Sequence, residues 1–134
     1  MIFVDASALI AIIAGEEDAD GLADILGAER SRLCSAMSVW ETVAGLCRSY
    51  TFSIETAREH VAAFQAAAAL QHVAIGEREL TAALAAYTQF GKGRHPAALN
   101  MGDCFAYACA KTHGAMLLYK GANFSKTDLA LPSR

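Results

Sequence analysis

Residues 2–9 have the sequence Ile2-Phe3-Val4-Asp5-Ala6-Ser7-Ala8-Leu9. The short unbroken apolar run at residues 2–4 predicts a strand buried on both faces, and the apolar pattern that follows predicts a helix over 6–14. In open α/β sheets, ligands bind at the carboxyl ends of such strands. Asp5 therefore either presents a carboxylate at the mouth of the sheet or caps the next helix, where aspartate is common. Taken alone, this stretch favours the cap.

The same alternation of short apolar runs and helical patterns continues along the chain. Strands separated by helices predict βαβ units, and therefore an α/β fold with a mainly parallel central sheet of four to five strands flanked by helices. No linker or repeat interrupts the pattern, so we expect a single domain over residues 1–134. The expected strands are 2–4, 32–34, 72–75, 115–119 and an edge strand near 129–131; the expected helices are 6–14, 17–28, 35–48, 53–68, 77–90 and 101–113.

Composition narrows the function classes. Hydrophobic residues make up 54% of the chain, but no run of about 18 uncharged apolar residues exists, so we expect no membrane span. The start lacks the pattern of a signal peptide, which predicts a cytoplasmic protein. The four cysteines form no C-x-x-C pair, which argues against a zinc site or a disulfide framework. Because the net charge is −3, the protein could bind a polyanionic partner only through a local basic patch.

Three acids, Asp5, Glu41 and Asp103, stand at comparable element boundaries. Each has a structural alternative: a helix cap for Asp5, the last position of a capping box begun by Ser38 for Glu41, and the first turn of a helix capped by Asn100 for Asp103. Apolar residues surround Glu41 and Asp103, and acids in apolar surroundings are costly unless they are paired or bind a cation.

A divalent cation would remove the repulsion among three such carboxylates. Oxygen-only ligation favours Mg²⁺ or Mn²⁺ over zinc. Mg²⁺ usually retains water, and a retained water can be activated for attack on a phosphodiester. The acids alone also fit other metal phosphohydrolases, acting on DNA or on small molecules.

Four stretches together resemble PIN-domain ribonucleases, and the VapC toxins of bacterial toxin–antitoxin pairs in particular. Residues 2–9 resemble the opening motif, Glu41 matches the second acid, residues 100–108 resemble the third acidic motif and residues 117–128 the closing motif. The resemblance covers essentially the whole chain. It implies a Mg²⁺-dependent ribonuclease with Asp5, Glu41 and Asp103 as catalytic and metal-binding residues. It also places Ser7 beside the metal as a hydrogen-bond donor, although a first-turn helix serine is an equal alternative.

The closing motif departs from the family at one position. VapC toxins usually carry a fourth acid where this chain has Asn123, whose amide oxygen contributes no charge. We therefore expect weaker metal retention. A catalytically weakened or inactive PIN domain, serving as an RNA- or protein-binding module, is the alternative function. Asp128 is expected to be a turn residue rather than the missing ligand.

The densest basic cluster, Lys92-Gly93-Arg94-His95, lies just ahead of the third acidic motif. An isolated basic loop is usually only a solvated surface. Its position here instead predicts that Lys92, Arg94 and His95 contact RNA phosphates.

The resemblance further implies structured RNA as substrate and a VapB-type antitoxin as partner. The apolar residues of the first half predict an exposed patch and hence assembly. We expect a homodimer, with an antitoxin segment in a groove between helices near residues 6–28 and 38–64. The apolar residues that suggest this are Trp40, Leu46, Phe52, Ile54 and Phe64.

Overall fold

The structure is a computed structural model in which residues 1–131 are described. The predicted domain extends to residue 134, and its last three residues lie outside the described part. The strands are β1 (Ile2–Val4), β2 (Arg32–Cys34), β3 (Gln71–His72) and β4 (Met116–Leu118). The helices are α1 (Ala6–Ala14), α2 (Ala19–Gly27), α3 (Ala36–Tyr50), α4 (Ile54–Ala67), α5 (Glu77–Phe90) and α6 (Met101–Thr112), followed by the 3₁₀ turn η1 (Phe124–Lys126).

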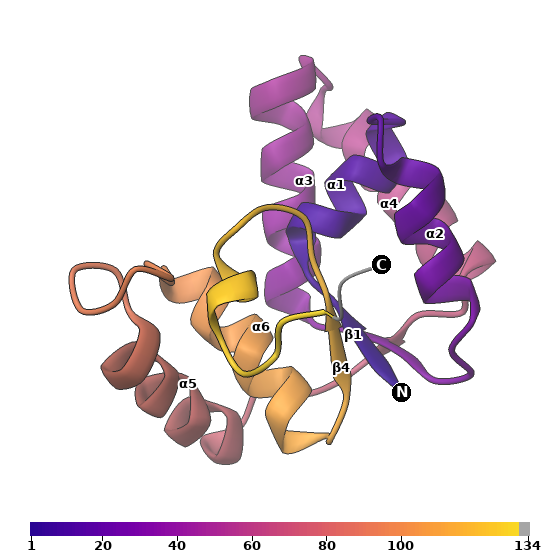
Figure 1. Ribbon diagram of the computed structural model, residues 1–134. Helices are drawn as coiled ribbons and strands as arrows, with labels where there is room; N and C mark the ends of the chain where they lie inside the picture. Colours follow the sequence, from indigo (N-terminus) through magenta and orange to yellow (C-terminus); the bar gives the residue numbers. More distant parts are fainter. Residues whose placement is uncertain (132–134) are drawn as a thin grey trace.

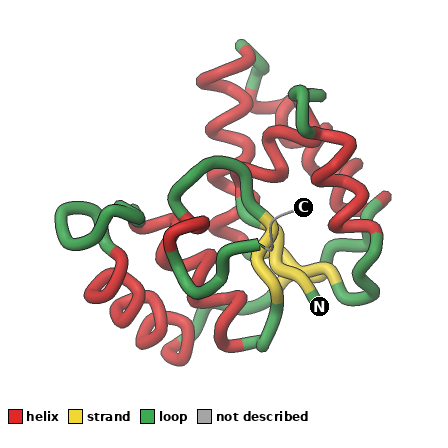
Figure 2. Tube along the Cα trace, viewed as in Figure 1, coloured by secondary structure: helices red, strands yellow, loops and turns green. Residues whose placement is uncertain are grey.

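The four strands form one parallel sheet in the order β3-β2-β1-β4. Figure 2 shows the strands gathered at the centre with helices around them. The chain order changes direction at β1, because β2 and β3 lie on one side of it and β4 on the other. Ligands of open α/β sheets bind at such a switch point, outside the carboxyl ends of the strands. Asp5 follows β1 at this place, and its N–H donates to Leu118 O at 2.9 Å.

Alternate residues of the strands face opposite layers, as the two-residue period of a strand requires. Phe3 and Leu117 pack in the core formed with α5 and α6. Ile2, Val4 and Leu118 pack in the core formed with α1 and α2. Figure 1 shows these two helix pairs on opposite sides of the strands. The sheet is therefore buried on both faces, which explains the unbroken apolar run of β1.

Local signals set most helix boundaries. Ser35, Ser53 and Asn100 each accept a hydrogen bond from the backbone N–H three residues on and so cap α3, α4 and α6. Gly114, with φ of 61°, lies just beyond the end of α6 in the left-handed region that favours glycine. No helix within residues 1–131 is long and apolar enough to cross a membrane.

The predicted edge strand near residues 129–131 is wrong. This segment is irregular, because side chains take up the backbone N–H groups that a strand would pair. Leu129 N donates to Thr127 Oγ1 at 3.1 Å and Leu131 N to Tyr119 Oη at 3.0 Å. The prediction for residues 72–75 overestimated β3, which is exposed and only two residues long.

Candidate active site

Asp5 both caps a helix and lies at the mouth of the sheet. Its carboxylate accepts from Ser7 N at 3.0 Å and from Ser7 Oγ at 2.6 Å. Ser7 Oγ in turn accepts from Lys120 N, just beyond β4, at 3.0 Å. The cap predicted for Asp5 is confirmed. Ser7, in the first turn of α1, orients this carboxylate and ties it to the end of the neighbouring strand.

Glu41 lies in the second turn of α3. The capping box suggested for Ser38 and Glu41 is wrong, because Ser35 is the N-cap and Ser38 is the third helical residue of its own box. The Glu41 side chain instead lies beside the first turn of α6. A Cβ atom added at Gly102 would come within 2.0 Å of Glu41 Oε2. Glu41 thus takes no part in capping α3, and its side chain lies beside the helix that carries Asp103.

Asp103 lies in the first turn of α6 after the cap Asn100, as the sequence predicted, and it also completes a capping box with Asn100. Its N–H donates to Asn100 Oδ1 at 2.9 Å, and Asp103 Oδ2 accepts from Asn100 N at 3.1 Å. The Asn123 side chain lies close enough to Asp103 to lower its pKa, although burial outweighs this influence and the net shift is upward. The closing segment therefore brings Asn123 near Asp103.

The three carboxylates influence one another electrostatically. Burial, and to a smaller extent the charge of Asp103, raises the pKa of Asp5 to about 6. Burial and the charges of Asp5 and Asp103 raise the pKa of Glu41 to about 7. Three acids from separate parts of the chain thus share one negative region, where a proton or a cation lowers the energy.

The donor set has the chemistry of a site for a hard divalent cation. Carboxylate and amide oxygens from Asp5, Glu41, Asp103 and Asn123 are the ligands that Mg²⁺ and Mn²⁺ prefer. Among residues 1–131, no three His, Cys, Asp or Glu side chains stand close enough to hold one ion as they are. A cation held by all three carboxylates would therefore have to draw them closer together.

The basic loop between α5 and α6 is well held at its base. Lys92 N donates to Leu99 O, and Leu99 N to Phe90 O, both at 3.0 Å. The His95 ring packs edge-on against Phe90, and its Nδ1 accepts from the backbone of the same loop at 3.0 Å. Lys92 and Arg94 are exposed. The His95 ring therefore stabilises the loop from which the Lys92 and Arg94 side chains extend.

Asp128 lies in a turn, as expected. It accepts a hydrogen bond from Tyr107 Oη at 2.6 Å and forms an ion pair with Lys111, both on α6. These contacts fasten the segment that carries Asn123. Sequence reasoning missed this anchor. It also missed the close approach of Gly102 to Glu41, for which a glycine inside a helix, beside an acid, was the available signal.

Comparison with known proteins identifies the family of the chain. Residues 2–129 match the PIN domain family. The chain belongs to this family. It is 41% identical over 127 residues to Ribonuclease VapC30 of Mycobacterium tuberculosis, covering 95% of each chain. It is 40% identical over 141 residues to a VapC ribonuclease of Rhizobium meliloti, covering 96% of this chain and 99% of that one. The prediction that this PIN domain is an enzyme of the VapC ribonuclease class is confirmed.

Two solved structures share the fold of this PIN domain. The crystal structure of VapC20 of Mycobacterium tuberculosis, a toxin that cleaves the sarcin–ricin loop, superposes with a TM-score of 0.71 at 20% identity over 93% of both chains. A toxin–antitoxin complex from Klebsiella pneumoniae gives 0.70 at 16% identity, over 98% of this chain and 97% of that one. The predicted α/β fold with a parallel sheet is confirmed.

Proposed function

We propose that this PIN domain is a Mg²⁺-dependent endoribonuclease that cleaves structured RNA and serves as the toxin of a VapBC-type pair. The observation that carries the proposal is the electrostatic influence that Asp5, Glu41 and Asp103 exert on one another near the switch point of the sheet, where the pKa of each is raised. Strongly perturbed pKa values of neighbouring acids are typical of functional sites, where the charge of the acids is used in binding or catalysis. The cytoplasm, where RNA is abundant, is the compartment in which we expect it to act.

In this proposal Asp5, Glu41 and Asp103 hold the cation, with Asn123 beside them. When bound, Mg²⁺ would supply an activated water and would stabilise negative charge on the phosphoryl oxygens. Ser7 keeps the Asp5 carboxylate oriented through two hydrogen bonds.

The basic loop acts on the RNA itself. Lys92 and Arg94 would neutralise substrate phosphates and set the register of the RNA. The Arg94 guanidinium lies 4.9 Å from the centre of the Tyr87 ring, which limits where its charge is presented. Because Nδ1 of His95 accepts from Ala97 N, Nε2 is the ring nitrogen that would contact a phosphate.

The test is cleavage of total RNA with Mg²⁺ by purified wild type and by Asp5→Ala. We expect cleavage by the wild type and none by the variant, while Asp24→Ala, an exposed acid on α2, cleaves normally. Full activity of Asp5→Ala would remove the carboxylate cluster from the mechanism.

Asn123 favours a second candidate, a PIN domain that binds RNA or protein with little or no turnover. It places an uncharged amide beside Asp103, so the site carries less negative charge for a cation than the family pattern has. RNA binding by the wild type without cleavage at any Mg²⁺ concentration would favour this candidate.

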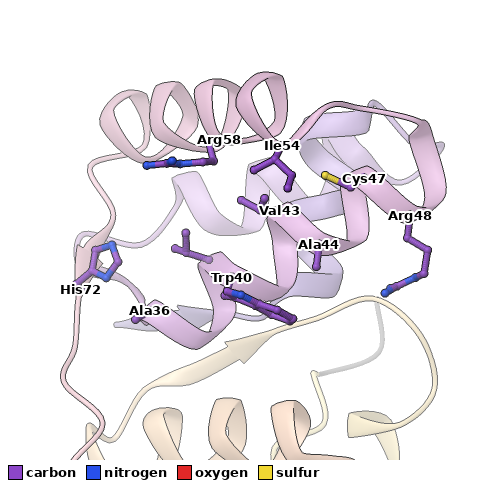
Figure 3. A pocket seen from close by; sticks show the side chains of 10 residues that line it. Ala36, Trp40, Val43, Ala44, Cys47, Arg48, Ile54, Arg58 and His72 are labelled. Carbon is purple, nitrogen blue, oxygen red and sulfur yellow. The ribbon is translucent and has the colours of Figure 1, made fainter.

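An antitoxin segment is the partner we propose for a groove of about 780 Å³ between α3 and α4. Figure 3 shows Trp40, Val43 and Ile54 turned toward it, with Arg58 and His72 at one end and Arg48 at the other. Trp40 is 71% and Ile54 61% exposed, which is unusual for such large apolar side chains. The groove belongs to the 38–64 part of the predicted antitoxin surface.

We also propose a homodimer, which rests on other apolar residues than those that the sequence suggested. Leu46 is fully buried, and Phe52 and Phe64 are half-buried, so these residues leave little surface for assembly. Exposed apolar side chains do follow one stripe of α5 and continue at the start of α6. They are Leu80, Leu84, Tyr87 and Met101.

A further inference from the structure

Gly102 occupies a helical position where glycine has no conformational purpose. It is the second residue of α6, and its φ is not in the left-handed region. Glycine within a helix is less favourable than alanine, because it loses more backbone freedom on folding. A reason other than backbone geometry is therefore needed for its presence.

The space beside Gly102 is filled by one carboxylate. A Cβ at this position would lie 2.0 Å from Glu41 Oε2, 2.5 Å from Cδ and 2.6 Å from Oε1. These are its three nearest atoms, so the whole head group of Glu41 occupies the place of the missing methyl. Real Cβ atoms do not approach other atoms so closely. An alanine methyl at position 102 would therefore clash with the Glu41 carboxylate in its present position.

The place that Gly102 leaves open lies in the first turn of α6, where the helix dipole partly offsets the burial and the like charges that raise the pKa of Glu41. The first backbone N–H groups of a helix have no acceptor within it, and the helix dipole is positive at this end. The same turn carries Asp103, whose charge raises the pKa of Glu41. A carboxylate is therefore both admitted by Gly102 and brought beside the third acid, although α3 and α6 belong to different parts of the chain.

We propose that Gly102 is a positioning residue: the absence of its side chain sets the Glu41 carboxylate against the first turn of α6, within the group of acids that takes the cation. The role in cation binding rests on the proposed function. Because Glu41 is a flexible side chain on another helix, a methyl at residue 102 would turn the carboxylate away rather than unfold α6. The expected defect is thus a displaced ligand in a folded protein.

The experiment compares wild type, Gly102→Ala, Glu41→Ala and the double variant. Calorimetric titration with Mn²⁺ should show binding weakened about tenfold or more by Gly102→Ala, the range found when groups that orient metal ligands are lost. In the Glu41→Ala background, Gly102→Ala should leave Mn²⁺ binding unchanged. Thermal unfolding without metal gives a second measurement. Gly102→Ala should raise the midpoint when Glu41 is absent, since alanine favours the helix, and raise it less or lower it when Glu41 is present.

Gly21→Ala is the matched control, because Gly21 is also helical and a Cβ there meets nothing within 4 Å. It should leave Mn²⁺ binding unchanged in both backgrounds. Wild-type Mn²⁺ affinity in Gly102→Ala, or an equal loss with and without Glu41, would overturn the inference. If Gly102→Ala fails to fold, a folded double variant supports the inference and an unfolded one overturns it. Absence of RNA cleavage by the wild type, with the predicted Mn²⁺ and unfolding results intact, would refute only the proposed function.

Discussion

Replacing Asp5 by asparagine is expected to stabilise the metal-free protein at neutral pH. Asp5 is only 5% exposed, and burial is the main reason that its pKa rises from 3.8 to about 6. A shift of about two pKa units corresponds to about 3 kcal/mol of folding free energy. Asparagine keeps an oxygen that accepts from Ser7 but carries no charge to bury.

The sign of the pH dependence follows from the direction of the shift. Since the pKa of Asp5 is higher in the folded than in the unfolded protein, folding favours the protonated form. The stability that this group contributes is complete below the unfolded value of 3.8 and is lost as the pH rises through about 6. The asparagine of Asp5→Asn does not titrate, so this variant does not lose folding free energy as the pH rises through this range.

Urea unfolding with a chelator present, at several pH values from about 4 to 8, measures the effect. The free energy of unfolding of Asp5→Asn should equal that of wild type at the acid end and exceed it by up to about 3 kcal/mol at the alkaline end. Asp24→Asn, an exposed control on α2, should follow the wild type. Parallel pH curves for wild type and Asp5→Asn would refute the claim that a buried charge at this position opposes folding.

Three further predictions concern other parts of the molecule. Asn123→Asp should lower the Mg²⁺ concentration needed for half-maximal RNA cleavage. Opposite unit charges about 4 Å apart attract by about 4 kcal/mol at a dielectric of about 20, and the cost of desolvating the new carboxylate reduces this gain. An unchanged midpoint would place residue 123 outside the reach of the cation. Tyr107→Phe removes the hydrogen bond to Asp128 and should lower the free energy of unfolding by about 1 kcal/mol, whereas an unchanged value would mean that the ion pair with Lys111 suffices as the anchor. Ile54→Glu puts a charge into the apolar groove and should weaken binding of a cognate antitoxin without changing RNA cleavage; unaltered antitoxin affinity would move the partner to another surface.

The fold was largely predictable, because its signals are local. Ser35, Ser53 and Asn100 mark helix starts, and the apolar runs mark the three buried strands. Prediction was wrong where tertiary contacts decide. The segment at 129–131 has a strand-like composition, but side-chain oxygens of Thr127 and Tyr119 capture its N–H groups.

The acids of the candidate site were predictable as a set, and their arrangement was not. Asp5 and Asp103 follow from element boundaries, and the family resemblance adds Glu41. The expected helix over 35–48 already begins at Ser35, but that Ser38 completes its capping box depends on backbone geometry. The fit of Glu41 against Gly102 depends on how two helices pack, which no local pattern records.

The proposed function requires Asp5, Glu41 and Asp103 to hold one divalent cation together. A crystal structure of the protein soaked with Mn²⁺, in which anomalous scattering locates the ion, tests this directly. We expect a single strong peak among these carboxylates, with metal–oxygen distances of about 2.0–2.2 Å, close to those of Mg²⁺. A peak elsewhere, or none at these residues in crystals saturated with Mn²⁺, would contradict it.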